Sequence, residues 1–252
     1  MSLRTIGPTD AAFEECLQGF QNDVATATRC FYAMETINHL ASQDTVLLQK
    51  LNEAPEFWNL VQGSNQNSLF ITLGRIFGQE KDAQFTLDKI FGLAEAGGGA
   101  IFSKDRLADR KRHDSTTADE WLPDYLKTAY VPLPKNFRAW KKIRNLFRRK
   151  FEATYRPIRH EIYAHSIASE ERKVQLFAET RIADLQRTIR FLIRVSDGLR
   201  QLYNNGRNPM VGPFAPTSVS HVVTRTSTER SASDQEVIFK ATQKVMEQVK
   251  QS

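Results

Sequence analysis

Cysteine is scarce in this chain of 252 residues, which has only Cys16 and Cys30. Neither belongs to a Cys-x-x-Cys pair, and neither has a histidine at the spacing of a metal-ligand set. Both fall in segments with helical periodicity, where a free cysteine usually behaves as a small buried hydrophobic residue. We therefore predict structural cysteines, with no disulfide framework and no zinc site.

Long apolar runs are also missing. No hydrophobic stretch approaches the roughly 20 residues that cross a bilayer, and the first residues, MSLRTIGPTDAAFEE, lack the apolar core of a secretory signal. A hydrophobic share of 40% with 25% charged residues is ordinary for a globular protein, so a packed core is expected. We expect a cytoplasmic protein with no membrane contact.

Alternating apolar and polar residues, the pattern of a half-buried strand, are absent as well. Nearly every apolar segment repeats at three and four residues, which predicts an all-α fold. A charged segment, 100–116, looks irregular, and TADE at 117–120 is typical of a capping box that begins a short helix. The helices expected from periodicity cover 10–21, 24–51, 83–96, 136–166 (interrupted by Pro157) and 170–203.

The end of the chain differs in composition from the rest. Residues 212–233 are rich in Ser and Thr and have no sustained periodicity, which is typical of a linker. SDQE at 233–236 favours the start of a last amphipathic helix. We predict a helical domain over 1–210, a linker over 211–233 and a C-terminal helix over 234–252.

Positive charge is concentrated in one segment. The net charge is +6, and ten Lys or Arg but one acid lie between Lys135 and Arg159. On an α-helix the apolar residues of this segment share one side and the basic residues the other. A row of cations at this spacing can follow a phosphate backbone, although a solvated helix face has the same pattern. The basic side contains Arg138, Lys141, Lys142, Arg149, Arg156, Arg159 and His160.

This row runs into RHEIYAH at 159–165, where an arginine and a histidine are separated by five residues. The pattern is weak, because Arg106 and His113 match it with six residues between them. That second match lies in the charged 100–116 segment without an apolar stripe, so we interpret it as accidental. On an α-helix His165 continues the apolar stripe and points inward or toward a partner, about 120° from Arg159. A satisfied core histidine is therefore the alternative interpretation.

The stretch RPIRHEIYAHS resembles the signature of the HEPN superfamily of small helical-bundle proteins, many of which cleave RNA. Its pattern is similar to the Arg-polar-x-x-x-Ala-His motif of the abortive-infection AbiU-like branch. LFITLGRIFGQEKDAQFTLDKIF at 69–91 is similar to the Arg-Ile-Phe element of that branch and the Thr-Leu helix after it. The likeness spans roughly residues 20–205. It implies an up-and-down antiparallel bundle with extra helices and a C-terminal tail helix.

The resemblance implies a catalytic pair, Arg159 and His165, accompanied by His160 in a position where asparagine is more usual. Such a pair would cleave RNA without a metal and with no cofactor, in phage defence or as a toxin. Histidine suits proton transfer and arginine suits phosphorane oxygens. The residues expected to hold the RNA strand are Arg138, Lys142, Arg149 and Arg156.

The resemblance also implies binding partners, and two alternative functions stay open. The family implies a homodimer that joins two motifs at one cleft, and an antitoxin or regulatory partner is a further expectation. One alternative is a non-catalytic HEPN module that binds RNA, nucleotide or a partner protein. The other is a helical DNA- or RNA-binding regulator in which His165 only packs in the core.

Overall fold

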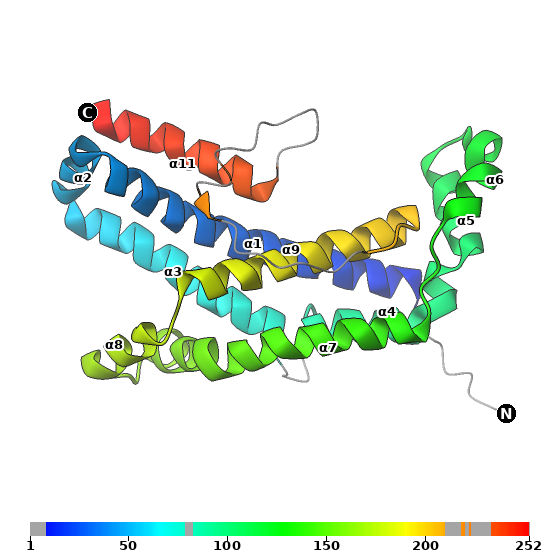
Figure 1. The fold of residues 1–252 in the computed structure, drawn as a ribbon, viewed down its shortest axis with the longest axis horizontal. Helices are drawn as coiled ribbons and strands as arrows, with labels where there is room; N and C mark the ends of the chain where they lie inside the picture. Colours follow the sequence, from blue (N-terminus) through cyan, green and yellow to red (C-terminus); the bar gives the residue numbers. More distant parts are fainter. Residues whose placement is uncertain (1–8, 79–82, 210–217, 220–221, 223–232, 252) are drawn as a thin grey trace. The chain divides into compact units, whose positions relative to one another are not determined.

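Helices form all the regular secondary structure of the residues that the computed structural model describes, namely 9–78, 83–209, 218–219, 222 and 233–251. No strand occurs among them, which confirms the predicted all-α helical bundle (Figure 1). The elements are α1 (Asp10–Gln43), α2 (Thr45–Asn52), α3 (Pro55–Phe77), α4 (Leu87–Phe102), α5 (Lys104–Asp114), α6 (Ala118–Thr128), α7 (Pro134–Lys150), η1 (Phe151–Tyr155), η2 (Ile158–Ala164), α8 (Glu170–Ala178), α9 (Ile182–Asn205) and α11 (Asp234–Gln251).

Side-chain oxygens begin several of these helices. Asp44 accepts hydrogen bonds from the N–H groups of Val46 and Leu47 at 3.0 and 3.1 Å, so α1 ends and α2 begins at this residue. Such caps satisfy backbone donors that have no partner in the first turn and contribute about 1 kcal/mol each. Equivalent caps are formed by Thr86 on α4, Ser103 on α5 and Ser169 on α8.

The chain divides into two compact units. Unit 1 consists of Met1–Asn22, Arg75–Lys150 and Phe191–Pro213, and unit 2 of Asp23–Gly74, Phe151–Arg190 and Phe214–Ser252. Helices α1, α3 and α9 each contribute residues to both units. The division predicted from the sequence stays a prediction, since most of its linker (211–233) lies outside the described residues.

Unit 1 is built around α4 and α7, and α5 packs against both α4 and α6. Aromatic residues on the inner face of α7 join these helices. Phe137 meets Trp140 edge to face at 5.2 Å and tilts against Phe102 of α4 at 5.9 Å. Phe137 is 1% exposed and Trp140 8%, so the apolar stripe of α7 faces the core as its sequence predicts.

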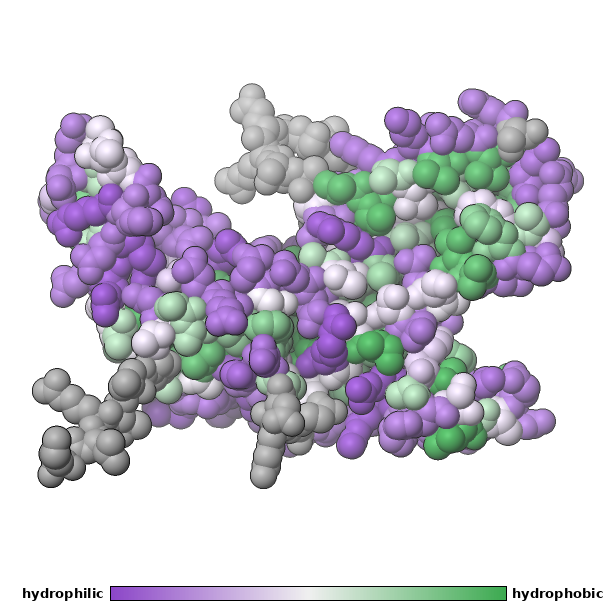
Figure 2. Space-filling view, turned by 180° about the vertical axis from the view of Figure 1, so that it is seen from behind, coloured by the Kyte–Doolittle hydropathy of each residue, from purple (hydrophilic) through white to green (hydrophobic). Residues whose placement is uncertain are grey.

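In unit 2, α11 lies beside α2 (Figure 1). Met246 of α11 packs with Ile37, Leu47 and Leu51 in a hydrophobic cluster. Lys250 pairs with Asp44 at 2.5 Å, and the hydrogen bond from Lys250 lowers the pKa of the Asp44 carboxyl. Figure 2 shows hydrophobic surface on this part of unit 2, where exposed apolar side chains lie on α2, α3 and α11.

Several helix ends differ from their predicted positions. Residues 10–43 form one helix, where the sequence predicted a break near 22 and a second helix to 51. The predicted helix over 170–203 is two helices, α8 and α9, because Ala178 and Ile182 are separated by a turn in which the Thr180 hydroxyl and N–H both bond to the Phe177 carbonyl.

The charged 100–116 segment is not irregular, which corrects the prediction. It contains α5, in which Leu107 and Ala108 are buried. The Arg110 guanidinium lies 4.1 Å over the Tyr203 ring and bonds to Asp10 and to the Ile101 carbonyl. A cation can therefore take a core-facing position that a hydrophobic pattern does not reveal.

The two predicted helix starts, SDQE at 233–236 and the capping box TADE at 117–120, have different outcomes. At α11 the Ser233 hydroxyl accepts from the Glu236 N–H at 3.3 Å, and the Glu236 carboxylate accepts from the Ser233 N–H at 3.1 Å. At α6 the Thr117 side chain makes no capping hydrogen bond, so that prediction was wrong although the helix exists. Thr117 has φ −97° and ψ 11°, which is not the extended conformation of a capping residue.

Within the described ranges, no helix has the length and apolar character needed to cross a bilayer.

Candidate active site

The motif at 159–165 lies in an unusual helix. After α7 the backbone continues as two π-helical stretches, η1 and η2, with Pro157 between them. Proline has no N–H to donate to an earlier carbonyl, so it disturbs the α-helical ladder. π-Helical turns are rare and frequently occur at functional sites. The helix predicted over 136–166 is therefore present, but angles for an α-helix do not place Arg159 and His165.

The structure brings His160 and His165 together. The His165 N–H donates to the His160 carbonyl at 3.1 Å, and the two rings meet edge to face with centroids 4.5 Å apart. Both residues are exposed. Of the two predicted orientations of His165, the inward one is wrong, because the π-helical turns shift its phase and η2 ends at Ala164; the orientation toward a partner subunit stays a prediction. His165 is therefore not a core residue.

A tight turn after η2 fixes the position of His165. The N–H groups of Ile167 and Ala168 both donate to the Glu161 carbonyl, at 2.8 and 3.1 Å. Ser166 adopts φ 52°, in the left-handed region that non-glycine residues rarely occupy. Such conformations persist where the surrounding structure holds them, and they cluster at functional sites.

The Glu161 side chain holds the same turn from the other side. Its two carboxylate oxygens accept from Nε and Nη2 of Arg172 on α8, at 2.9 and 3.0 Å. This bidentate hydrogen bonding lowers the pKa of the Glu161 carboxyl, with smaller contributions from the charges of Arg172 and His160 against the effect of desolvation. Glu161 therefore stays ionised and ties α8 to η2 on both sides of the His165 turn.

Arg159 packs against α3, whereas the two histidines are exposed. It is half-buried, and its side chain crosses Gly74 of α3 so closely that a Cβ on Gly74 would lie 2.7 Å from Nε and 2.9 Å from Cδ. The prediction that Arg159 lies on the outward basic side is therefore wrong. The contact joins the two sequence stretches that resemble the HEPN signature.

Aromatic residues anchor the π-helical segment to α3. The Phe70 ring stacks on Tyr163 with centroids 5.8 Å apart and tilts against Tyr155 at 6.0 Å and Phe177 at 6.3 Å. Burial raises the pKa of the Tyr163 phenol to about 12, and it also raises the pKa of Tyr155. Phe70 thus fixes η1, η2 and α8 through one contact each.

The basic residues divide into two groups. Lys141 forms an ion pair with Glu95 of α4, while Arg144 and Arg148 pair with Asp88 at 2.6 and 2.5 Å. Lys141 is half-buried and already paired. The prediction that it belongs to the outward row of cations is therefore wrong. The other group has exposed side chains that make no ion pair with any described residue: Arg138, Lys142 and Arg149 on α7 in unit 1, and Arg156 in unit 2.

The second pair that matches the Arg and His spacing lies on a different helix from the motif at 159–165. Arg106 and His113 lie on α5, where Arg106 approaches Asp10 at 3.8 Å and Asp109 at 3.9 Å. His113 is exposed at the last turn. The pair thus provides an internal comparison for the motif at 159–165.

Other reactive groups are few in the part of the chain that the structure describes. No three His, Cys, Asp or Glu side chains gather there as metal ligands. Cys16 is buried, which raises the pKa of its thiol to about 11, and burial also raises the pKa of the Cys30 thiol. Both cysteines therefore stay protonated near neutral pH.

Sequence reasoning missed the residues that position the motif. Gly74 gave one signal, since it directly precedes the Arg-Ile-Phe element that resembles the AbiU-like branch. Arg172 and Phe70 gave none, because a charge in a helical segment and an apolar residue in an apolar run are both ordinary.

Comparison with known proteins gives one family. The model of a HEPN family described as AbiU2 matches residues 10–223, most of the chain. The search of curated proteins and the search of solved structures found no match.

Proposed function

This chain belongs to the AbiU2 family of HEPN proteins, and we propose that it is a metal-independent endoribonuclease. It is a HEPN module of the abortive-infection type, and the proposal adds RNA cleavage, in phage defence or as a toxin. The observation that carries it is the contact of two exposed imidazoles, His160 and His165, whose ring centroids lie 4.5 Å apart at the end of the π-helix η2. We also propose that the protein acts in the cytoplasm, where it would meet such RNA.

The proposed reaction needs two proton transfers. The ribose 2′-hydroxyl attacks the adjacent phosphorus, the bond to the 5′-oxygen breaks, and the products are a 2′,3′-cyclic phosphate and a 5′-hydroxyl. One imidazole accepts the proton of the 2′-hydroxyl, and the other, as imidazolium, gives a proton to the departing 5′-oxygen. General acid and base catalysis by positioned side chains contributes about 10²–10⁴-fold each.

Arg159 is proposed to stabilise the negative oxygens of the phosphorane. Guanidinium stays charged at all working pH values and presents planar donors to phosphate. The contact with Gly74 restricts the Arg159 side chain at Cδ and Nε. Less conformational entropy is therefore lost when the guanidinium binds a phosphate.

The RNA strand is proposed to bind Arg138, Lys142, Arg149 and Arg156. Their side chains are exposed, and among described residues none forms an ion pair. Cations that are already paired, such as Lys141, gain less from a phosphate because they must first leave a carboxylate. Contacts to phosphate position the strand without reading its sequence.

We propose a homodimer as the working state, with an antitoxin or other regulatory partner as a further binding protein. Ile167, in the turn after His165, is 67% exposed, and Val174 of α8 is 70% exposed. Apolar side chains left in water beside a catalytic turn suit a protein interface.

The test is cleavage of a mixed RNA pool in EDTA by the wild-type chain and by His165→Ala, with product ends mapped. We expect cyclic phosphates from the wild type and at least about a hundredfold slower cleavage by the variant. His113→Ala is the matched control, since it removes an exposed histidine of the accidental match. Absence of cleavage by the wild type would contradict the proposal and leave a non-catalytic binding module. Equal cleavage by wild type and His165→Ala would contradict the catalytic role of His165.

The role of His160 has its own test. His160→Asn keeps a polar side chain but cannot transfer a proton. If both imidazoles act, the bell-shaped pH dependence of kcat/KM loses one limb in this variant, while RNA affinity is retained. An unchanged pH profile with a lower rate throughout would show that His160 only positions His165.

A further inference from the structure

Helix α7 has an outer face that stays exposed along its whole length in unit 1. The exposed residues recur every three or four positions, so they lie along one side of the helix. We call this set the outer stripe of α7. It consists of Lys135, Arg138, Ala139, Lys142, Asn145, Leu146 and Arg149.

The opposite side of α7 is fixed to the rest of unit 1. Phe137 and Trp140 are buried in the core, and the Lys141 ammonium pairs with Glu95 of α4. These contacts set the rotation of the helix about its own axis. The outer stripe is therefore directed away from the core before any partner binds.

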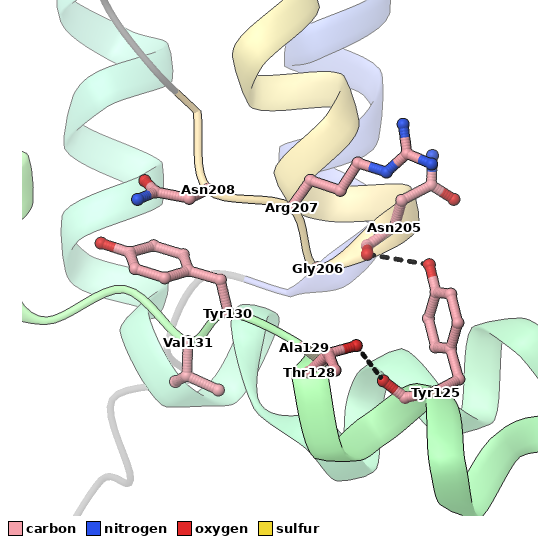
Figure 3. Close-up of a pocket in the computed structure, with 9 residues that line it drawn as sticks. All are labelled: Tyr125, Thr128, Ala129, Tyr130, Val131, Asn205, Gly206, Arg207 and Asn208. Atoms are coloured by element: carbon pink, nitrogen blue, oxygen red, sulfur yellow. Dashed lines mark hydrogen bonds between the residues drawn. The ribbon is translucent and has the colours of Figure 1, made fainter.

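The start of α7 is held in place as well. The Leu133 N–H donates to the Asn136 side-chain oxygen at 2.8 Å, and Pro134 takes the first helical position, which suits its fixed φ. Before this point, the Tyr125 hydroxyl of α6 donates to the Asn205 carbonyl at 2.9 Å (Figure 3). The chain that leads into α7 is thus tied to the end of α9.

Every charged residue of the outer stripe is a cation. Lys135, Arg138, Lys142 and Arg149 are exposed, and none of them forms an ion pair within the described ranges. The stripe contains no carboxylate. It therefore attracts acidic groups, whether they belong to a phosphate backbone or to another protein.

Two apolar residues lie among these cations. Leu146 is 64% exposed and lies between Lys142 and Arg149, and Ala139 precedes it by seven residues. Seven residues make about two helical turns, the spacing at which side chains of two packed helices interdigitate. A phosphate backbone gains nothing from an exposed leucine, whereas a helix that covers it removes apolar surface from water. The outer stripe is therefore also a surface for helix packing.

We propose that the outer stripe binds an acidic amphipathic helix of a partner protein. Its apolar side chains pack over Ala139 and Leu146, and its carboxylates pair with the flanking cations. A second copy of the same stripe is disfavoured as the occupant, because cations would meet cations. The bound helix covers Arg138, Lys142 and Arg149, so it excludes an RNA strand from them. That consequence alone rests on the proposed function.

The experiment measures the affinity of the full chain for a labelled acidic peptide by fluorescence anisotropy. The probe has three heptads with leucine at a and d and glutamate at e and g, so its charges oppose pairing with itself. We expect saturable binding that Leu146→Ser weakens at least about tenfold, because the burial of a leucine is lost. Leu60→Ser is the matched control, since Leu60 is 67% exposed on α3, outside the stripe.

Both variants replace exposed side chains, so their thermal unfolding should match that of the wild type. Three results would overturn the proposal. They are the absence of saturable binding, an unchanged affinity in Leu146→Ser, and equally tight binding of a peptide in which serine replaces every leucine. The last result would mean that the stripe binds acidic groups without using its apolar residues.

Two further measurements test the other occupants of the stripe. Vesicles that contain phosphatidylserine test a lipid surface, and sedimentation of the chain by itself tests a second copy. A loss of vesicle binding or of self-association in Leu146→Ser, without any binding of the peptide by the wild type, would contradict the proposal.

A competition assay separates this inference from RNA cleavage. A 2′-O-methylated hexanucleotide cannot be cleaved, and the peptide should displace it from the chain. Leu146→Ser should keep its affinity for the hexanucleotide, whereas Lys142→Ala should lose affinity for both ligands. Simultaneous binding of both ligands would contradict the exclusion of RNA. Peptide binding by a chain that cleaves no RNA supports this surface and contradicts the proposed function, and cleavage without peptide binding does the reverse.

Discussion

At the scale of single residues, the tightest fit in the candidate site lies between Gly74 and Arg159. Gly74 is buried on α3, and the space that its missing Cβ leaves is occupied by the Arg159 side chain. A methyl group 2.7 Å from Nε has no room, so the arginine or the helix must shift. The position of the guanidinium thus depends on the absence of one carbon atom.

We predict that Gly74→Ala folds but cleaves RNA about a hundredfold more slowly, because displacing a catalytic group by about 1 Å has an effect of this size. The measurement is the single-turnover cleavage rate beside the thermal unfolding temperature. Gly63→Ala is the control on the same helix, since Gly63 is exposed and a Cβ there meets nothing within 4 Å.

Gly63→Ala should keep full activity and gain about 0.5–1 kcal/mol of stability, the usual effect of alanine in a helix. Full activity in Gly74→Ala as well would mean that Arg159 reaches the phosphate from another position. Loss of folding in Gly74→Ala would be recognised by its unfolding curve and not scored as loss of catalysis.

Arg159, His160 and His165 could be named from the sequence because they lie within seven residues and resemble a known signature. Their arrangement could not, because it depends on distant residues. The contact of the two imidazoles follows from π-helical turns, and the direction of Arg159 follows from a glycine on another helix.

At the scale of secondary structure, hydrogen bonds to Glu161 hold the turn after η2. Ile167 and Ala168 donate to the Glu161 backbone, and the Glu161 carboxylate binds Arg172. The pKa of this carboxyl lies below its ordinary value of 4.5 in the folded chain. A lowered carboxyl pKa stabilises the folded state above the ordinary value, and this contribution is lost as pH falls through the lowered one.

We predict that Glu161→Gln is less stable than the wild type at neutral pH and that the difference disappears in acid, below the lowered pKa of Glu161. Thermal unfolding of both proteins across this pH range measures it. Hydrogen exchange at the Ile167 and Ala168 amides should be faster in the variant at neutral pH, because the turn opens more often.

Glu170→Gln is the control for this prediction. Glu170 pairs with Lys173 at 2.6 Å on the same helix as Arg172, but its side chain is 82% exposed, so the pair contributes little. A constant difference between wild type and Glu161→Gln at all pH values would show that the charge of Glu161 does not hold the turn.

The sequence predicts where helices occur, but it does not predict their geometry. Periodicity identified the long segment from 136 to 166, yet it assumes about 3.6 residues per turn and cannot detect a π-helix. Pro157 marked the interruption, but the form that the chain takes there depends on Phe70 packing against Tyr155 and Tyr163. For α5 the sequence failed because Arg110, a charged residue, fills a core-facing position over Tyr203.

At the scale of the whole molecule, the net charge of +6 matters less than which cations already have partners. The sequence placed Lys141 with the outward cations, because its angle on an α-helix is close to theirs. Its partner, Glu95, lies on α4 and cannot be inferred from α7 alone. Fewer cations are therefore exposed than the sequence indicates. Their contribution to RNA binding can be measured from its salt dependence.

The final prediction concerns the salt dependence of RNA binding. Replacing Arg138, Lys142, Arg149 and Arg156 by alanine removes four proposed phosphate contacts. Each contact to a single strand contributes about 0.7 to the slope of log K against log salt, so the slope should fall by about 3. Fluorescence anisotropy of a labelled RNA at several salt concentrations measures it, with His165→Ala as the background that prevents cleavage.

Lys141→Ala is the matched control, because it removes a cation of the same helix that is already paired with Glu95. Its slope should stay within experimental error of the unsubstituted background. Equal loss of slope in this variant would mean that the general positive field, and not the exposed residues, attracts RNA. An unchanged slope in the fourfold variant would place the strand elsewhere on the molecule, while leaving the assignment of His160 and His165 to be decided by cleavage.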